Sequence, residues 1–262
     1  MQKLSVSVVL PVVDELQNLL ILIPRLIIQL ENAYEFEILV IDDSSFPCGE
    51  ILLSLIGDDS RHIRYIHRDD RSGLASAIEF GLNLARFELI CWLDADLSMP
   101  PEILPKLFNE VFQGFDICIA SRFIPGGGFK GMSRTDSTFK EIYLNIRNSE
   151  DSLLSVILSR ILNSILRYIL NCGINDLTSG YILAKKSLIK EVGITGFYGE
   201  YFPVLVYKLR QITNSIVEVP YICLPRVHGV SKTGTNLITY IRRGFPYITQ
   251  SLKAKLDSRF VK

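Results

Sequence analysis

Apolar residues in the first half of the chain follow two alternating patterns. Short apolar runs are typical of buried strands: Leu4–Leu10, Phe36–Ile41, Ile63–His67, Leu89–Leu93 and Phe115–Ala120. Between them, apolar residues recur at helical spacing: Glu15–Leu30, Glu50–Leu55, Gly73–Ala85 and Pro101–Val111. This alternation predicts an α/β fold with a mostly parallel central sheet and helices on both of its faces.

The second half of the chain is less regular but contains two amphipathic segments. Leu153–Leu170 has pairs of apolar residues at helical spacing, with Arg160 and Arg167 on its other faces. Asn236–Leu256 combines aliphatic and aromatic residues with basic ones. We therefore predict a domain over residues 1–235, followed by an amphipathic basic helical tail over residues 236–262. Both helices suit an anionic membrane surface, and packing on the domain is the alternative for each.

Composition and charge exclude several classes of protein. The chain has 262 residues, enough for one large α/β domain, and its 28 basic and 28 acidic residues give no reason to expect a nucleic acid partner. We find no signal-peptide pattern and no uncharged apolar run long enough to span a membrane. The five cysteines are scattered, without a Cys-x-x-Cys pair. We expect a cytoplasmic protein that is soluble or bound peripherally to the cytoplasmic face of a membrane.

Four of the predicted strands are followed by polar residues, together with a proline after the first strand. These residues are Pro11, Asp14 and Glu15 after the first strand, Asp42 and Asp43 after the second, Asp94 and Asp96 after the fourth, and Ser121 and Arg122 after the fifth. Open parallel sheets bind ligands beyond the carboxyl ends of their strands, so these residues predict a site at that edge. Helix capping or a turn is the alternative explanation for each aspartate taken alone.

The triplet Asp94-Ala95-Asp96 is the strongest candidate for chemistry. In an extended segment, residues two apart point the same way, so both carboxylates can face one ligand. Hard oxygen ligands of this kind suit Mg²⁺ or Mn²⁺, which keep several waters and bridge substrate phosphates. A paired-carboxylate acid/base site is the competing interpretation, but nothing nearby indicates different environments for the two groups.

A series of motifs then identifies a resemblance that covers nearly the whole chain. The motifs are Val9–Glu15, Val40–Ser45, Gly73–Ala85, Trp92–Glu102, Ala120–Gly131, Ser159–Asn163, Asp176–Tyr181 and Arg226–Lys232. Asp94–Glu102 and Ser121–Gly128 are the most specific parts. In this order, the motifs resemble the family-two glycosyltransferases of the Rossmann-like GT-A fold. Within that family, the chain is most similar to the dolichol-phosphate and polyprenol-phosphate mannose synthases.

The resemblance implies a role for each matching residue. Asp96, Arg122 and Arg226 would be catalytic; Pro11, Glu15, Asp42, Asp94 and Lys232 would bind the donor; Asp94 and Asp96 would hold Mg²⁺ or Mn²⁺; and Ser159 and Arg160 would bind the acceptor. Metal and guanidinium groups stabilise the negative charge that develops on a leaving diphosphate. A lipid phosphate is already anionic and can attack the sugar without a protein base, so the expected outcome is inversion.

The implied reaction is transfer of mannose from GDP-mannose to a polyprenyl or dolichyl monophosphate. One alternative is a polyprenyl-phosphate glucosyltransferase using UDP-glucose, and another is a non-catalytic subunit that binds a nucleotide sugar. Two departures from the family pattern affect the choice of sugar and base more than the reaction class. Val13 replaces a common aromatic residue, and Ser155 stands where a basic residue is expected.

Overall fold

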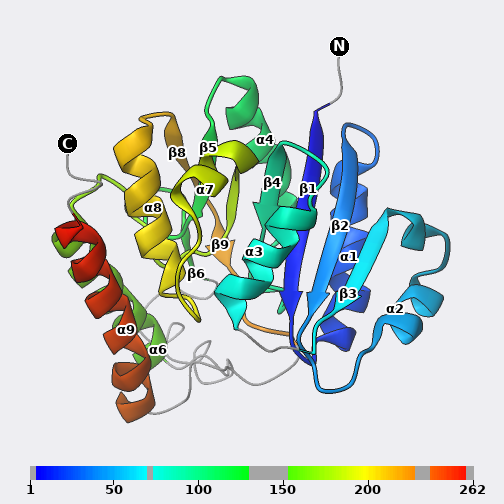
Figure 1. The fold of residues 1–262 in the computed structure, drawn as a ribbon, viewed down its shortest axis with the longest axis horizontal. Helices are drawn as coiled ribbons and strands as arrows, with labels where there is room; N and C mark the ends of the chain where they lie inside the picture. Colours follow the sequence, from blue (N-terminus) through cyan, green and yellow to red (C-terminus); the bar gives the residue numbers. More distant parts are fainter. Residues whose placement is uncertain (1–3, 70–72, 130–152, 228–236, 258–262) are drawn as a thin grey trace, which may run out of the picture.

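The computed structural model describes residues 4–69, 73–129, 153–227 and 237–257, with side chains in the last two ranges described from residues 156 and 242 onward. A seven-stranded sheet forms the centre, in the order β3-β2-β1-β4-β7-β5-β8 (Figure 1). Its strands are β1 (Ser5–Val12), β2 (Glu35–Asp42), β3 (Ile63–His67), β4 (Leu89–Trp92), β5 (Ile117–Ser121), β7 (Ile182–Lys185) and β8 (Ile216–Pro220). Only β7 runs antiparallel to its neighbours in this sheet. The short strands β6 (Gly128–Phe129) and β9 (Ile222–Cys223) pair separately.

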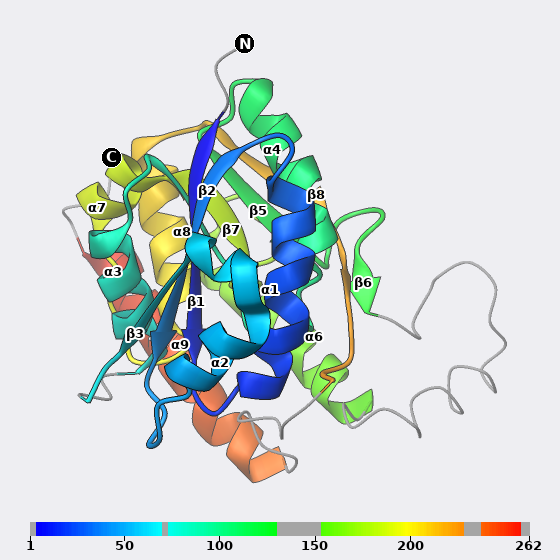
Figure 2. The same ribbon diagram turned by 90° about the vertical axis from the view of Figure 1, so that its right-hand side faces the viewer.

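Helices cover both faces of the sheet because alternate strand residues point to opposite sides. The helices are α1 (Leu16–Leu30), α2 (Gly49–Ile56), α3 (Leu74–Leu84), α4 (Leu104–Phe112), α6 (Leu153–Leu170), α7 (Lys186–Val192), α8 (Tyr201–Ile212) and α9 (Leu237–Leu256), with 3₁₀ turns at Gly57–His62 and Pro101–Ile103. One core packs Val8 and Val40 against α1 and α4, and the other packs Val9 and Ile41 against α3 and α8 (Figure 2). The predicted fold class is confirmed.

The elements expected in the first half are confirmed, with bounds that shift by a few residues. The helices expected at 153–170 and near the carboxyl end are also present, as α6 and α9. In contrast, β7, α7, α8 and β8 have no counterpart among the predicted elements. The chain turns back at β7, which enters between β4 and β5 and pairs with both.

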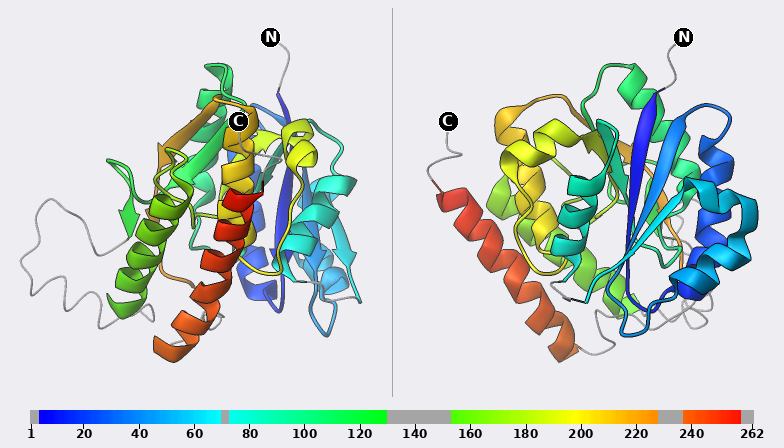
Figure 3. Two further views of the ribbon diagram at one scale, coloured as in Figure 1. Left: turned by 60° about the vertical axis from the view of Figure 1, so that its left-hand side comes forward. Right: turned by 45° about the vertical axis from the view of Figure 1, so that its right-hand side comes forward.

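The last helix packs against the rest of the molecule. It lies beside α6 and also contacts α8 (Figure 3). Ser251 and Ala254 of α9 are buried, and Lys255 Nζ donates a hydrogen bond to the carbonyl oxygen of Ile169 at the end of α6. The predicted boundary after residue 235 lies outside the described residues. Within the described ranges, no helix combines the length and the apolar character needed to cross a membrane.

The topology brings the predicted site residues to one edge. Strands β1, β2, β4 and β5 run in the same direction, so their carboxyl ends all lie at the lower edge of the sheet in Figure 1. The residues that follow these strands therefore come from four distant parts of the sequence to one place.

Candidate active site

The loop after β4 holds Asp96 in a defined position. Asp96 Oδ1 accepts a hydrogen bond of 2.9 Å from the backbone N–H of Ser98, and Leu97 between them has a positive φ of 67°. Its other oxygen, Oδ2, lies 3.0 Å from Nη2 of Arg226, and only 5% of the Asp96 side chain is exposed. The structure thus brings together two of the three residues predicted to be catalytic.

Asp94 lies beside Asp96 in an environment that disfavours a second negative charge. Burial by the surrounding protein and, after it, the negative charge of Asp96 raise the pKa of Asp94 to about 7, against the opposing effect of Arg226. The side chain keeps partial contact with solvent. A cation placed between the two carboxylates would favour the ionised form of both.

These donors fit a divalent ion that is shared with a substrate. Among the described residues, no three His, Cys, Asp or Glu side chains gather closely enough to form a metal site by themselves. Mg²⁺ is commonly bound by one or two carboxylates and completes its coordination with water and substrate phosphates. Asp94 and Asp96 supply that number of carboxylates, so the predicted Mg²⁺ or Mn²⁺ fits here together with a phosphorylated ligand.

The loops after β1 and β2 are joined by a serine. Ser44 donates both its backbone N–H, at 2.8 Å, and its hydroxyl to Asp42 Oδ1. The same hydroxyl oxygen accepts the backbone N–H of Asp14 at 2.7 Å, and Tyr65 donates to the other Asp42 oxygen. Asp42 is completely buried. Its carboxylate therefore organises the two loops that border the predicted nucleotide pocket.

Two further predicted donor residues, Pro11 and Glu15, lie on the same part of the edge. Pro11 is partly exposed at the next-to-last position of β1, and Glu15 directly precedes α1, where it accepts a hydrogen bond from Asn18. Both adjoin the loop that Ser44 fastens, so the structure places the predicted donor residues Pro11, Glu15 and Asp42 together.

Arg122 after β5 forms a two-pronged ion pair with Asp176. Its Nε and Nη2 atoms each donate a hydrogen bond of 2.8 Å to the Asp176 carboxylate, and Nη2 also donates to Thr178 at 2.8 Å. Asp176 is fully buried, and 11% of the Arg122 side chain is exposed. Burial alone would lower the pKa of Arg122, but the Asp176 carboxylate raises it well above its usual value. The guanidinium is therefore fixed in orientation, and within the described residues its hydrogen bonds are made through Nε and Nη2.

The Asp176 loop is held by two residues whose roles the sequence did not reveal. Glu218 on β8 accepts hydrogen bonds of 2.8–2.9 Å from Asn175 N–H, the Asn175 side chain and Asp176 N–H. Asn163 on α6 donates to the Asn175 carbonyl oxygen at 2.6 Å and accepts from Leu177 N–H at 2.9 Å. The resemblance had included Asn163 and Asp176 in matching segments without giving either a role. The signal in the sequence was a polar residue within an apolar run, as with Asn163 and Glu218.

The predicted acceptor residues lie on α6. Ser159 is partly exposed and Arg160 is exposed, one turn before Asn163 on the same helix. Through Asn163, the helix is tied to the loop that orients Arg122. Lys232 and the side chain of Ser155 lie outside the described residues.

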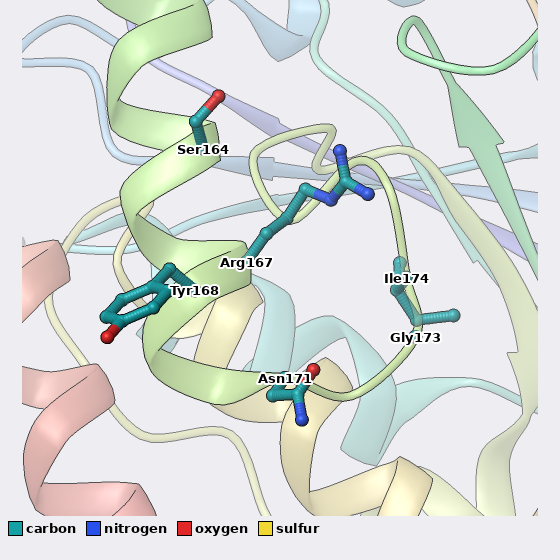
Figure 4. A pocket seen from close by; sticks show the side chains of 6 residues that line it. All are labelled: Ser164, Arg167, Tyr168, Asn171, Gly173 and Ile174. Atoms are coloured by element: carbon teal, nitrogen blue, oxygen red, sulfur yellow. The ribbon is translucent and has the colours of Figure 1, made fainter.

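A separate open cavity of about 290 Å³ lies at the carboxyl end of α6. Its lining residues are Ser164, Arg167, Tyr168, Asn171, Gly173 and Ile174 (Figure 4). None of them is a predicted site residue, so this cavity is distinct from the edge that carries Asp94 and Asp96.

Comparison with known proteins identifies the family of the chain. The family model for glycosyl transferase family 2 matches residues 7–193. Polyprenol monophosphomannose synthase of Mycolicibacterium smegmatis is 30% identical over 241 residues, covering 88% of this chain and 82% of that protein. Dolichol-phosphate mannosyltransferase of Pyrococcus furiosus is 27% identical over 243 residues, covering 91% of this chain and 62% of that protein.

Among solved structures, glucosyl-3-phosphoglycerate synthase from Mycobacterium tuberculosis, in complex with Mn²⁺, uridine diphosphate and phosphoglyceric acid, has a TM-score of 0.62. It is 18% identical, and the match covers 97% of this chain and 80% of that one. This likeness confirms the predicted GT-A fold.

Proposed function

The chain belongs to glycosyl transferase family 2, and from this premise we propose that it transfers mannose from GDP-mannose to a polyprenyl monophosphate. The observation that carries the proposal is the pair Asp94 and Asp96 at the end of β4, with Arg226 against Asp96 at 3.0 Å. Two carboxylates and a guanidinium suit a diphosphate bound through a divalent cation. The relative that matches over 82% of its length is named for this product class.

The proposed reaction is a direct displacement at the anomeric carbon. An oxygen of the acceptor phosphate forms the new bond to that carbon, while the bond to the nucleotide diphosphate breaks and the diphosphate leaves with its electron pair. Asp94 and Asp96 would hold a divalent cation, which would supply positive charge to the leaving diphosphate, and Arg226 would contact the phosphate oxygens of that group. Arg122, oriented by Asp176, directs Nη1 to a phosphate. A single displacement inverts the configuration of the anomeric carbon, and the anionic acceptor phosphate requires no protein base.

A second donor, UDP-glucose, has one observation in its favour. The structural neighbour named above is a glucosyl transfer enzyme with bound uridine diphosphate, and Val13 here offers no ring on which a purine can stack. The deciding experiment supplies radiolabelled GDP-mannose or UDP-glucose with polyprenyl phosphate, in Mn²⁺ or in EDTA. We expect the mannosyl lipid to form faster, and only with the metal. Faster transfer from UDP-glucose would establish the alternative, and nucleotide binding without transfer would establish a non-catalytic subunit.

The acceptor is a lipid, so we also propose that the outer face of α6 and α9 lies on the membrane. On α6, Ile157, Ile161 and Tyr168 are 48%, 50% and 88% exposed, and on α9 Phe245 and Leu256 are 64% and 81% exposed. Neither helix contains an acidic residue. The exposed basic residues are Arg160, Arg167, Arg242, Arg243, Lys253 and Lys255. Apolar side chains among basic residues, on helices that contain no acidic residue, suit an anionic bilayer.

Reversing two charges on α9 is expected to weaken binding to vesicles. The variant Arg242→Glu with Arg243→Glu should bind phosphatidylserine vesicles at least about tenfold more weakly, since each basic residue near such a surface contributes roughly 1 kcal/mol. Co-sedimentation at low salt measures this. Lys106→Glu with Lys190→Glu, on the exposed faces of α4 and α7, is the matched control and should pellet like the parent. Equal pelleting of all three proteins would contradict a membrane role for this face.

A further inference from the structure

In the structure, Arg226 forms an ion pair with Asp96, whose carboxylate is a metal ligand in the proposed function. Its Nη2 lies 3.0 Å from Asp96 Oδ2. The other oxygen of Asp96 accepts the N–H of Ser98 at 2.9 Å. Both oxygens of this carboxylate are therefore engaged by the chain itself.

A divalent cation and Arg226 compete for Asp96. Only 5% of the Asp96 side chain is exposed, so water screens charges poorly around it. A cation on this carboxylate would stand next to a guanidinium of the same sign. While Arg226 stays in place, Asp96 is therefore a weak metal ligand.

Arg226 has another partner when a diphosphate is present. Its backbone segment is fastened next to the Asp96 loop, because Leu224 N–H donates a hydrogen bond of 3.0 Å to the Ser98 carbonyl oxygen. Its side chain is 24% exposed and long enough to reorient without moving this anchor. A guanidinium can bind phosphate through two parallel hydrogen bonds, so a diphosphate offers Arg226 a favourable alternative to Asp96.

We propose that Arg226 pairs with Asp96 in the nucleotide-free protein and releases it to a divalent cation only when a nucleotide diphosphate binds. This inference rests on the proposed function, since it assigns the diphosphate and the cation to this edge. As a consequence, the cation and the nucleotide strengthen each other's binding. This coupling must be equal in both directions. Without a nucleotide, Asp94 and Asp96 then bind a divalent cation only weakly.

The test measures Mn²⁺ affinity of the full chain, by electron paramagnetic resonance of free Mn²⁺, with and without GDP. In the parent, GDP should tighten Mn²⁺ binding about tenfold, within the usual range of such couplings. In Arg226→Gln, Mn²⁺ alone should bind about fivefold more tightly than in the parent, and Mn²⁺ with GDP should bind more weakly. Damage to the fold would weaken both, so changes of opposite direction are specific to the proposed role.

Two further variants make the outcome decisive. Arg226→Lys keeps the charge and should leave Mn²⁺ binding without GDP close to that of the parent. Arg86→Gln, at an exposed position after α3, should change neither affinity. Unchanged or weaker Mn²⁺ binding without GDP in Arg226→Gln overturns the inference and leaves the proposed function standing. Failure of GDP and UDP to bind any variant in the presence of Mn²⁺ overturns the proposed function instead.

Discussion

Asp96→Asn is expected to lower turnover about a thousandfold while leaving the protein folded. The carboxamide keeps an oxygen that can accept the Ser98 N–H, so the loop retains its shape. It loses the negative charge that the proposed cation and Arg226 both require. Because a metal ligand contributes several kcal/mol to the stabilisation of a leaving diphosphate, the effect falls on the chemical step. The measurement is transfer of radiolabelled mannose to polyprenyl phosphate in saturating Mn²⁺.

The matched control for this variant is Asp116→Asn. Asp116 lies just before β5, at the opposite edge of the sheet, where its carboxylate pairs with Lys185. It should transfer mannose at nearly the parent rate, and both variants should unfold near the parent temperature. Asp96→Asn activity within about threefold of the parent, still abolished by EDTA, would remove Asp96 from the metal site.

Asp176→Ala is expected to lower the free energy of unfolding by about 3–5 kcal/mol. The substitution leaves the Arg122 guanidinium, which is 11% exposed, without its carboxylate partner. It also removes the acceptor for the backbone N–H groups of Arg122 and Thr178. A buried charge that loses its partner keeps its desolvation penalty, which explains the size of the effect. Urea unfolding followed by the fluorescence of Trp92, the single tryptophan, measures it.

The comparison for Asp176→Ala is Asp116→Ala, which breaks an ion pair whose partners, Asp116 and Lys185, are 27% and 47% exposed. Solvent screens such a pair, so its loss should cost no more than about 1 kcal/mol. A loss of similar size in the two variants would show that Arg122 and Asp176 do not form a buried pair in solution. Arg122→Lys should lie between them, since a lysine retains the charge but cannot make both contacts to Asp176.

The elements of the first half were predictable because each carries its own signal. Val8 and Val9 alternate between the two faces of β1, and the stripe on α1 packs Leu19 and Leu22 into one core. Such patterns depend on neighbours in the sequence, and here burial on both faces agrees with them. Strand β7 was not predicted because three apolar residues and a lysine, followed directly by a helix, are too short a segment to show a strand periodicity. Its pairing with β4 and β5 supplies the missing hydrogen bonds.

In the site, the local sequence predicted that two residues are close together only where they lie on the same loop. Asp94 and Asp96 are two positions apart after a buried strand, so their proximity follows from the chain itself. The partner of Arg122 lies 54 residues away, and that of Asn175 lies 43 residues away on β8. No spacing in the sequence encodes these pairs.

The sequence by itself thus determined the parallel α/β order of the first half, the edge at which Asp94 and Asp96 meet, and the resemblance to family 2. Only the tertiary structure decided that Asp42 connects two loops, that Asp176 binds the Arg122 guanidinium through two hydrogen bonds, and that Arg226 forms an ion pair with Asp96. Backbone periodicity is set by residues a few positions apart, whereas a buried charge must find its counter-charge wherever the fold brings one within reach.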